Sequence, residues 1–304
     1  MFKHIAGRLI EAFFALLLMS LLVFVLSRII GDPVALLLSD GATEEDRQLL
    51  ILQLGLDRPL WQQYFTFVGN ALTGDFGQST TAGRQDALDL VLTRLPASLS
   101  LAGVALAFTV LLGLILGVIA SVTRGTPIDL FVRLVALLGQ SVPSFWLGIM
   151  MIYLFAVKLG WLPTSGFGGP IYYVMPALTL GLFTLAAVTR LVRASMLEAL
   201  GSEYVKLARI KGISEAAVIF RHALGNSLIP VVTFMGTFFA TMITGAVVVE
   251  TVFAWPGIGR LAFESILARD FPVIQTVVLV ITAFFILANL IDEVLYLASD
   301  PRIM

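Results

Sequence analysis

The sequence predicts an all-α protein that crosses a membrane six times. Composition is the first reason: hydrophobic residues make up 59% of the 304 residues, charged residues make up 13%, and the mean hydropathy is +0.98. A soluble globular chain usually has about 25% charged residues. The second reason is the pattern, because apolar runs of about 20 residues, long enough to cross a bilayer as helices, alternate with short polar clusters. The net charge of −1 does not suggest a nucleic-acid partner, and the lack of cysteine excludes disulfides and thiol catalysis.

Six apolar runs define the expected transmembrane helices. They lie near residues 9–30, 97–121, 134–157, 172–192, 228–252 and 273–297. The first run could instead be a signal peptide, but no small-x-small cleavage pattern follows it before Gly31. We therefore expect an uncleaved first helix and five further spans.

Both termini are expected in the cytoplasm. Six spans place the two ends on the same side, and the short loops that stay in the cytoplasm are rich in Lys and Arg. Eleven of the nineteen basic residues lie in segments joined to the N-terminal side: Lys3, Arg8, Arg124, Arg133, Arg190, Arg193, Lys206, Arg209, Lys211, Arg221 and Arg302. The opposite short loops and span ends hold four: Arg28, Lys158, Arg260 and Arg269.

The chain is expected to have three parts. Residues 1–30 hold the cytoplasmic N-terminus and the first transmembrane helix, residues 31–95 form an external segment, and residues 96–304 form a core with five transmembrane helices. In the external segment, Thr43 followed by three acidic residues signals the start of a helix. Aromatic residues at helical spacing in 60–72 favour a second helix against the outer face of the bilayer. A solvated cap over the spans is the simplest role for this segment.

The stretch "YVKLARIKGISEAAVIFRHALGNSLIP", residues 204–230, is unusually basic for its surroundings. Its apolar spacing predicts two short helices that break at Gly212, a residue suited to the left-handed position after a helix end. The expected packing faces hold Tyr204, Leu207 and Ala208 before the break, and Ile213, Ala216, Ala217, Phe220 and Leu224 after it. Ser214 is a candidate N-cap, with Glu215 in the first turn. The sequence therefore predicts a helix–turn–helix elbow on the cytoplasmic surface, in a loop at about 198–226.

Three interpretations of this elbow remain. It could hold anionic lipid through its basic residues, it could be an ordinary basic loop, or it could dock into a groove of another protein. The glycine break, the small alanines and the compact charged rim favour docking.

A translocation path needs polar or small side chains that turn away from lipid. The candidates are Gln140, Ser141, Ser144, Thr233, Thr237 and Thr241. The three threonines recur every four residues and would share one helix face. Packing between spans explains such residues equally well, because small and hydroxyl side chains often join helices in membranes.

The elbow also resembles the cytoplasmic coupling loop of ABC importer permeases, specifically those of the dipeptide/oligopeptide/nickel branch. The resemblance continues along the chain in "GDPV" (31–34), "LGLDRPL" (54–60), "GDFGQS" (74–79), "TRLPASLSLA" (93–102), "SVPSFWLGIM" (141–150), "LGWLP" (159–163), "RLVRASMLEALGSEYV" (190–205), "VVVETVFAWPGIGRLAFESILARDFPVIQ" (247–275) and "SDPRI" (299–303). Before Gly212 the chain has Lys206-Leu207-Ala208 where the wider permease pattern has Glu-Ala-Ala, a variant typical of this branch.

This resemblance implies an ABC importer permease fold and a transport subunit without its own ATP site. The chain would pair with a second homologous permease and two ABC ATPase subunits, and an extracytoplasmic solute-binding protein would deliver the solute. The sequence has no G-x-x-x-x-G-K-[ST] motif, so no cofactor is expected on this chain, and ATP and Mg²⁺ would bind the partner ATPases. The resemblance further implies a multi-pass protein of a bacterial or archaeal cytoplasmic (inner) membrane that carries di- or oligopeptides.

The resemblance also points to site residues. Coupling to the ATPase is expected at Ala208, Arg209, Lys211, Gly212, Ser214 and Glu215. An external gate or binding-protein contact is expected at Glu250, Trp255 and Arg260, although Glu250 could instead brace the loop at 253–271. A stand-alone secondary transporter or channel is the alternative function. An intramembrane enzyme is disfavoured, because the spans hold no paired-acid, Ser–His or metal constellation.

Overall fold

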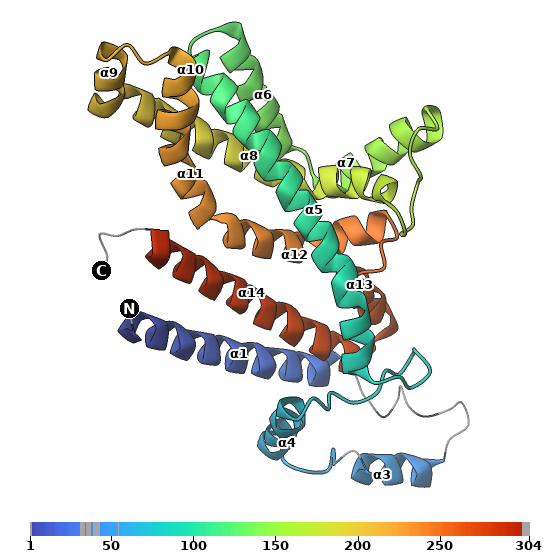
Figure 1. Cartoon of the computed structure of the whole chain (residues 1–304). Helices are drawn as coiled ribbons and strands as arrows, with labels where there is room; N and C mark the ends of the chain where they lie inside the picture. The colour runs from blue at the N-terminus through green and yellow to red at the C-terminus, as the bar shows by residue number, and fades with distance from the viewer. Residues whose placement is uncertain (1, 31–33, 35–37, 39–42, 54, 300–304) are drawn as a thin grey trace. The chain divides into compact units, whose positions relative to one another are not determined.

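The structure is a computed structural model of the full chain, and it describes residues 2–30, 34, 38, 43–53 and 55–299 (Figure 1). Side chains are described for these residues except 2–6, 30 and 292–299. The "GDP" turn at 31–33 and the final residues after 299 lie outside the described residues. In the described part of the chain, the elements are helices and turns with one isolated β-bridge, between Gln78 and Asp86. The predicted all-α class is confirmed.

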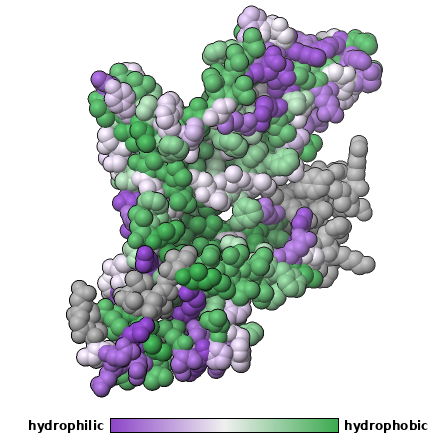
Figure 2. Space-filling model, turned by 180° about the vertical axis from the view of Figure 1, so that it is seen from behind, coloured by the Kyte–Doolittle hydropathy of each residue, from purple (hydrophilic) through white to green (hydrophobic). Residues whose placement is uncertain are grey.

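Among the described residues, six helices are long and apolar enough to cross a membrane, which is the predicted number, and a bent helix pair makes a seventh if it is counted as one span. The six are Gly7–Ile29, Ala87–Val122, Pro170–Gly201, Glu215–Thr233, Met235–Val252 and Phe271–Ile291. Many of their large hydrophobic side chains are exposed on this chain, and Figure 2 shows such side chains covering much of one face, with hydrophilic ones gathered in patches. Exposed apolar helix surface is what contact with lipid requires.

Two predicted spans differ from the structure in detail. The run at 134–157 is a helix pair, Pro127–Ser141 and Ser144–Lys158, bent by 105° at Pro143. Proline cannot donate the backbone hydrogen bond that would continue the helix, and it disfavours helical backbone in the residue before it. The run at 228–252 breaks at Phe234 into α11 (Leu224–Thr233) and α12 (Met235–Val252).

The chain divides into two compact units. The first unit consists of 1–97 and 257–286, and the second unit consists of 98–256 and 287–304. Two long helices, α5 (Ala87–Val122) and α14 (Phe271–Ser299), each contribute residues to both units. Each unit has its own internal packing.

In the first unit, α1 (Phe2–Ile30) packs against α4 (Leu60–Leu72). The ring of Phe24 lies 5.5 Å from the ring of Tyr64 and 5.8 Å from that of Phe67, centroid to centroid. The Tyr64 hydroxyl lies 2.9 Å from the hydroxyl of Ser20. The aromatic residues of α4 thus provide its contact with α1, while Trp61 and Phe65 stay exposed on the outer side of the helix.

The start of α3 (Glu44–Gln53), also in the first unit, follows the predicted pattern. The Thr43 hydroxyl accepts a hydrogen bond from the Asp46 backbone N–H at 3.2 Å, and the Asp46 carboxylate accepts one from the Thr43 backbone N–H at 2.9 Å. This reciprocal arrangement is a capping box. The hydrogen bonds from the Thr43 backbone N–H and hydroxyl hold the pKa of Asp46 below its ordinary value of 3.8.

In the second unit, α8 (Pro170–Gly201) is the central helix and packs against α6 (Pro127–Ser141), α7 (Ser144–Met151), α11 and α12. It also approaches α5 closely. A side-chain carbon added at Gly113 or Gly117 of α5 would lie 2.6 Å from Val188 or Val192 of α8, respectively. This spacing of four is the small-xxx-small pattern that lets helix backbones approach one another in membranes.

Candidate functional site

The elbow, residues 204–226, consists of short helices in the second unit at the end of α8 (Figure 1). They are α9 (Glu203–Ile210), α10 (Glu215–Ala217), the π-helix η2 (Val218–Ala223) and the first residues of α11. Gly212 has φ +76, and the N–H of Ile213 donates to the carbonyl of Ala208 at 3.2 Å. A residue in the left-handed region with a hydrogen bond back into the helix is a common helix end. The predicted break at Gly212 is confirmed.

A bidentate ion pair between Arg209 and Glu215 bridges the turn at Gly212. The Arg209 guanidinium donates from Nε to one oxygen of the Glu215 carboxylate at 3.1 Å and from Nη2 to the other at 2.6 Å. Both side chains are partly exposed, and they come from the two helices on either side of Gly212. Ser214 has the extended backbone of an N-cap, but its hydroxyl makes no capping hydrogen bond in this turn. The ion pair therefore supplies the side-chain link across the turn.

The buried face of the elbow is smaller than predicted, and part of the predicted pattern was wrong. Val205, Ala208 and Val218 are buried together, next to Leu200 of α8 and Ile213. Leu207, expected on the same face as Ala208, is instead 55% exposed. The reason is that the inward face of α9 is centred between Val205 and Ala208, and Leu207 lies well round the helix from that centre.

The second predicted stripe was also wrong at Phe220, which is 64% exposed. The buried residues on this side are Val218 and Ala223, both fully inaccessible. They are five residues apart, in the segment that forms the π-helix, where the hydrogen bonds span five residues instead of four. An α-helical spacing rule therefore selects the wrong side chains here.

The outward side of the elbow combines apolar and basic side chains. Ile210 is 82% exposed, and the exposed side chains of Leu207 and Phe220 add to this apolar surface. Lys211 is exposed beside Gly212 in the turn. On this chain the elbow thus presents uncovered hydrophobic surface, with the Arg209–Glu215 ion pair at its turn.

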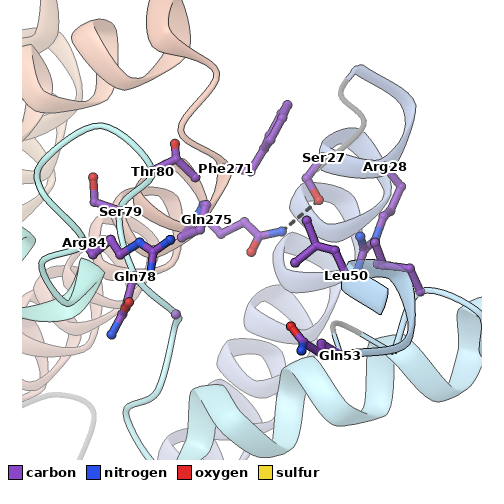
Figure 3. Close-up of a pocket in the computed structure, with 13 residues that line it drawn as sticks. Ser27, Arg28, Leu50, Gln53, Gln78, Ser79, Thr80, Arg84, Phe271 and Gln275 are labelled. Atoms are coloured by element: carbon purple, nitrogen blue, oxygen red, sulfur yellow. Dashed lines mark hydrogen bonds between the residues drawn. The ribbon is translucent and has the colours of Figure 1, made fainter. Parts of the chain in front are cut away.

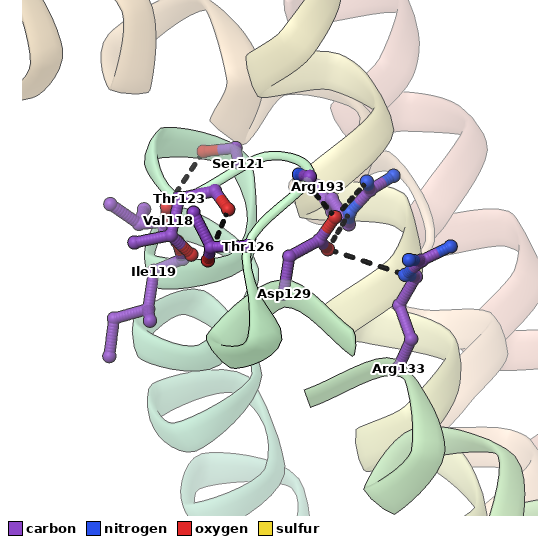
Figure 4. Close-up of polar contacts among 9 residues, drawn as sticks. Val118, Ile119, Ser121, Thr123, Thr126, Asp129, Arg133 and Arg193 are labelled. Carbon is purple, nitrogen blue, oxygen red and sulfur yellow. Dashed lines mark hydrogen bonds and ion pairs between the residues drawn. The ribbon is translucent and has the colours of Figure 1, made fainter. Parts of the chain in front are cut away.

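An ion-pair cluster around the buried Asp129, which sequence reasoning missed, lies between α6 and α8. The Asp129 carboxylate accepts hydrogen bonds from Nε and Nη2 of Arg193 at 2.8 and 2.9 Å, and one from the Gly125 backbone N–H at 3.1 Å (Figure 4). Arg133 adds a longer contact at 3.4 Å, and the Asp129 side chain is only 2% exposed. This cluster fastens the turn before α6 to α8, the helix that leads into the elbow.

The candidate path residues fall into two groups. Gln140, Ser141 and Ser144 lie at the bend between α6 and α7, and the Ser141 hydroxyl donates to the Leu137 carbonyl at 3.0 Å. The structure thus places these three at an irregular part of the backbone. They do not lie on a straight transmembrane helix.

The threonines were expected to follow one another on a single helix, and that expectation was wrong for Thr233. The break at Phe234 places Thr233 at the end of α11 and Thr237 and Thr241 in α12. Thr237 and Thr241 are exposed on successive turns of α12, and the Thr241 hydroxyl donates to the Thr237 carbonyl at 2.8 Å. These two remain candidates for a path or for a helix interface.

Glu250 and Trp255 are buried within the second unit. The Glu250 carboxylate accepts a hydrogen bond from the Ser98 hydroxyl at 2.5 Å, and its carbonyl accepts one from the Trp255 backbone N–H at 2.8 Å. The ring centroids of Phe167 and Tyr173 lie 4.9 and 4.6 Å from that of Trp255. This geometry favours the bracing alternative for Glu250 over a surface contact. Their external role stays a prediction.

Arg260, the third residue of that group, lies in α13 (Ile258–Ala268) of the first unit. Its Nε lies 2.7 Å from an oxygen of the Glu264 carboxylate, one helical turn away, and the pair is partly exposed. Such pairs support a helix locally and leave the guanidinium reachable by solvent. The predicted binding-protein contact at Arg260 is not tested.

Comparisons with known proteins cover nearly the whole chain. Residues 109–304 match the family described as "Binding-protein-dependent transport system inner membrane component", and residues 1–102 match the description of its N-terminal part. The chain belongs to this family. It is thus a permease component of an ABC importer and a multi-pass protein of the bacterial inner membrane, as the resemblance implied.

Curated relatives align with this permease from end to end. This chain is 40% identical over 304 residues to the glutathione transport system permease protein of Escherichia coli strain K12. The alignment covers 100% of this chain and 99% of that protein. The protein of the same name from Shigella dysenteriae serotype 1 matches to the same extent. The relatives therefore belong to the peptide and glutathione branch of these permeases.

Solved structures share the fold. An inward-facing methionine ABC transporter matches with a TM-score of 0.60 and 19% identity, over 69% of this chain and 96% of that one. An amino acid ABC transporter determined with histidines matches with a TM-score of 0.52 and 20% identity, over 70% and 94%. At these identities the likeness concerns the fold.

Proposed function

We propose that this permease forms half of the translocation path of an ATP-driven, binding-protein-dependent importer, and that its elbow docks into an ATPase subunit. The observation that carries the proposal is the outward side of the elbow, where Leu207, Ile210 and Phe220 are exposed on the single chain. Short helices with exposed apolar residues are suited to a groove on a partner. The other half of the path would come from a second homologous permease.

The elbow is built to pass on a movement. Gly212 and the Arg209–Glu215 pair keep its two arms in one arrangement. The buried residues of the elbow pack on Leu200 of α8, and Ala223 packs in the same cluster as Val192 of α8. A movement of the docked elbow would therefore displace α8 and α11. These helices would shift as rigid elements between two packing arrangements.

Orientation and energy supply follow from the same proposal. The eleven-to-four distribution of basic residues supports a cytoplasmic location for the elbow and both termini, where ATPase subunits would meet the elbow. ATP and Mg²⁺ would bind two partner ATPases, while this chain would hold no cofactor. An extracytoplasmic solute-binding protein would deliver solute to the opposite face.

A peptide-like solute is the best match for this importer. The name of the Escherichia coli relative specifies glutathione, a tripeptide, and the sequence resembles the dipeptide and oligopeptide branch. The exposed threonines of α12, Thr237 and Thr241, would line the path with hydroxyl groups. Such a lining would leave the choice of solute largely to the binding protein.

Co-purification tests the docking role. We expect the wild-type permease, expressed with its genomic neighbours, to carry an ATPase through purification, and Arg209→Ala to lose most of it because the turn loses its bridge. Lys206→Ala is the matched control, since it removes another exposed basic residue of α9, one that pairs with Glu203 of the same helix at 2.7 Å. Equal ATPase recovery from all three proteins would contradict docking at the elbow. Gradient-driven transport by this chain alone in liposomes would favour a secondary transporter.

A further inference from the structure

A cavity of about 630 Å³ with both polar and apolar lining residues lies in the first unit (Figure 3). Its walls come from the end of α1, from α3, from the loop at 77–84 and from the start of α14. Arg84 and Gln78 face it from the loop, Arg28 and Gln53 face it from the other side, and Gln275 lies between them. Cavities that hold small organic ligands usually have volumes of about 300–1,000 Å³. This one is large enough for a short peptide.

The charge of the cavity wall is one-sided. Two guanidinium groups, those of Arg28 and Arg84, contribute to the lining, and none of the described lining residues is Asp or Glu. The Arg28 guanidinium lies over the ring of Phe24, 5.3 Å from its centroid, and its buried Nε has no hydrogen-bond partner among the described residues. Stacking on an aromatic ring holds a guanidinium in place. The planar fork of arginine matches a carboxylate in particular.

The rest of the lining suits a peptide more than a simple ion. Gln53, Gln78 and Gln275 offer amide groups, which both donate and accept hydrogen bonds, as peptide groups do. Gln275 already donates to the Ser27 hydroxyl at 2.8 Å, which fixes its orientation (Figure 3). Phe271 adds an aromatic side chain to the wall. Together these groups could contact a carboxylate, peptide bonds and a side chain.

The loop that carries Arg84 is held in place. The buried carboxylate of Asp270 accepts hydrogen bonds from the Ser79 hydroxyl at 2.5 Å and from the Thr81 hydroxyl at 2.8 Å. It also accepts one from the Thr80 backbone N–H at 3.1 Å. All of these bonds reach the Oδ2 oxygen of Asp270, while its Oδ1 oxygen is buried without a hydrogen-bond partner among the described residues. Arg84 itself has φ +62, an uncommon conformation for a residue other than glycine.

We propose that this cavity is a solute subsite of the permease, and that Arg28 and Arg84, from opposite walls, each bind a carboxylate of a short peptide-like solute in it. The proposal rests on the proposed importer function and adds a binding site on the permease itself. A phospholipid headgroup also carries an anionic oxygen group that could pair with the two arginines. The amide groups and the volume favour the solute, and the test separates the two sources.

The test measures binding to the full-length permease in nanodiscs of phosphatidylcholine, with glutathione as the probe in isothermal titration calorimetry. We expect saturable binding that weakens by about tenfold or more in Arg84→Gln, because a charge-assisted hydrogen bond is lost. Arg28→Gln should act in the same direction. The diethyl ester of glutathione, which lacks free carboxylates, should bind as weakly to wild type as glutathione binds to the variants. Arg58→Gln is the matched control, an exposed arginine of the same unit outside the cavity.

Three results would overturn the proposal. The first is an Arg84→Gln protein that binds glutathione as wild type does, and the second is a wild type that shows no saturable binding. The third is a cavity that takes lipid, seen as one phosphatidylglycerol retained per wild-type chain, lost in Arg84→Gln, and blocking glutathione in mixed nanodiscs. ATPase co-purification, measured on the same variants, should stay unchanged. If ATPase co-purifies while glutathione binding fails, this subsite is wrong and the importer function stands; if no ATPase co-purifies with wild type, the importer function fails instead.

Discussion

The sequence predicts contact sites both in the elbow and in the turn at 250–255, but the two regions differ in how far their side chains are exposed. In the elbow, Ile210 is 82% exposed and the ion pair at the turn is open to solvent. In the 250–255 turn, Glu250 and Trp255 have no exposed surface. The elbow thus has hydrophobic side chains that this chain leaves exposed, whereas Glu250 and Trp255 are already covered by this chain.

This contrast separates docking from bracing. A charged or aromatic residue that stands out in an oily sequence can serve either purpose, since both need a specific partner for the side chain. Glu250 finds a hydrogen-bond partner within this chain, because Ser98 is far away in the sequence but belongs to the same unit. For the elbow, the exposed apolar side chains indicate a partner on another chain. Changes at four positions test this contrast between docking and bracing. Their expected effect on the stability of the fold decreases from Trp255→Ala to Thr237→Trp.

Trp255→Ala should have the largest effect. The variant removes a fully buried ring that packs edge-on against Phe167 and Tyr173, and large-to-small changes of this kind cost about 3–5 kcal/mol. We expect much lower yield of folded protein and a lower midpoint in thermal unfolding monitored by size-exclusion chromatography. A stable Trp255→Ala protein that fails only to respond to its binding protein would restore the surface-contact interpretation.

Ser98→Ala should have the next largest effect. It leaves the buried Glu250 carboxylate without the hydrogen bond from the Ser98 hydroxyl, which costs about 1–3 kcal/mol. Thermal unfolding of Ser98→Ala, Glu250→Ala and the double variant forms a mutant cycle, because each single change removes one partner of the hydrogen bond. We expect the double variant to be less destabilised than the sum of the two single variants. Full additivity would show that this hydrogen bond does not brace the turn.

Gly212→Val should destabilise the elbow while leaving the rest of the fold intact. The left-handed backbone costs roughly 1–2 kcal/mol for a residue with a β-carbon, although a β-carbon at this position would meet no atom within 4 Å. Gly212→Asn is the matched control, because asparagine tolerates this conformation best among other residues. We expect ATPase co-purification to fall in Gly212→Val and to persist in Gly212→Asn. Equal loss in both variants would point to contact with the glycine itself.

Thr237→Trp should have the smallest effect on stability and a large effect on flux. Thr237 is exposed on α12, so a larger side chain meets little of this chain. If Thr237 lines the path, solute uptake into cells should fall to background while ATPase co-purification stays normal. Normal uptake would assign this helix face to packing between subunits.

Local rules account for the parts of the fold that depend on neighbouring residues. The apolar runs predicted the number of spans, Gly212 predicted the break in the elbow, and Thr43 with Asp46 predicted the start of α3. Each of these depends on a few residues in succession. The bend at Pro143 could also have been predicted, because proline within an apolar run is a known kink signal.

Other features depend on contacts that spacing rules do not contain. Asp129 and Arg193 are 64 residues apart, and nothing in the sequence pairs them. The π-helix at 218–223 changes which side chains are buried, so the predicted stripe placed Phe220 inside. The close approach at Gly113 and Gly117 has a signal in the sequence, the spacing of four between glycines in an apolar run.

Docking of the elbow is tested most directly by labelling a single cysteine. The chain has no cysteine, so Ile210→Cys gives one thiol at the most exposed apolar position of the elbow, and Phe65→Cys gives one on exposed α4 as the control. We predict that a maleimide labels Cys at 210 rapidly in the purified chain and much more slowly once the ATPase is bound, while labelling at 65 does not change. Equal labelling at 210 with and without a bound ATPase would contradict docking at the elbow.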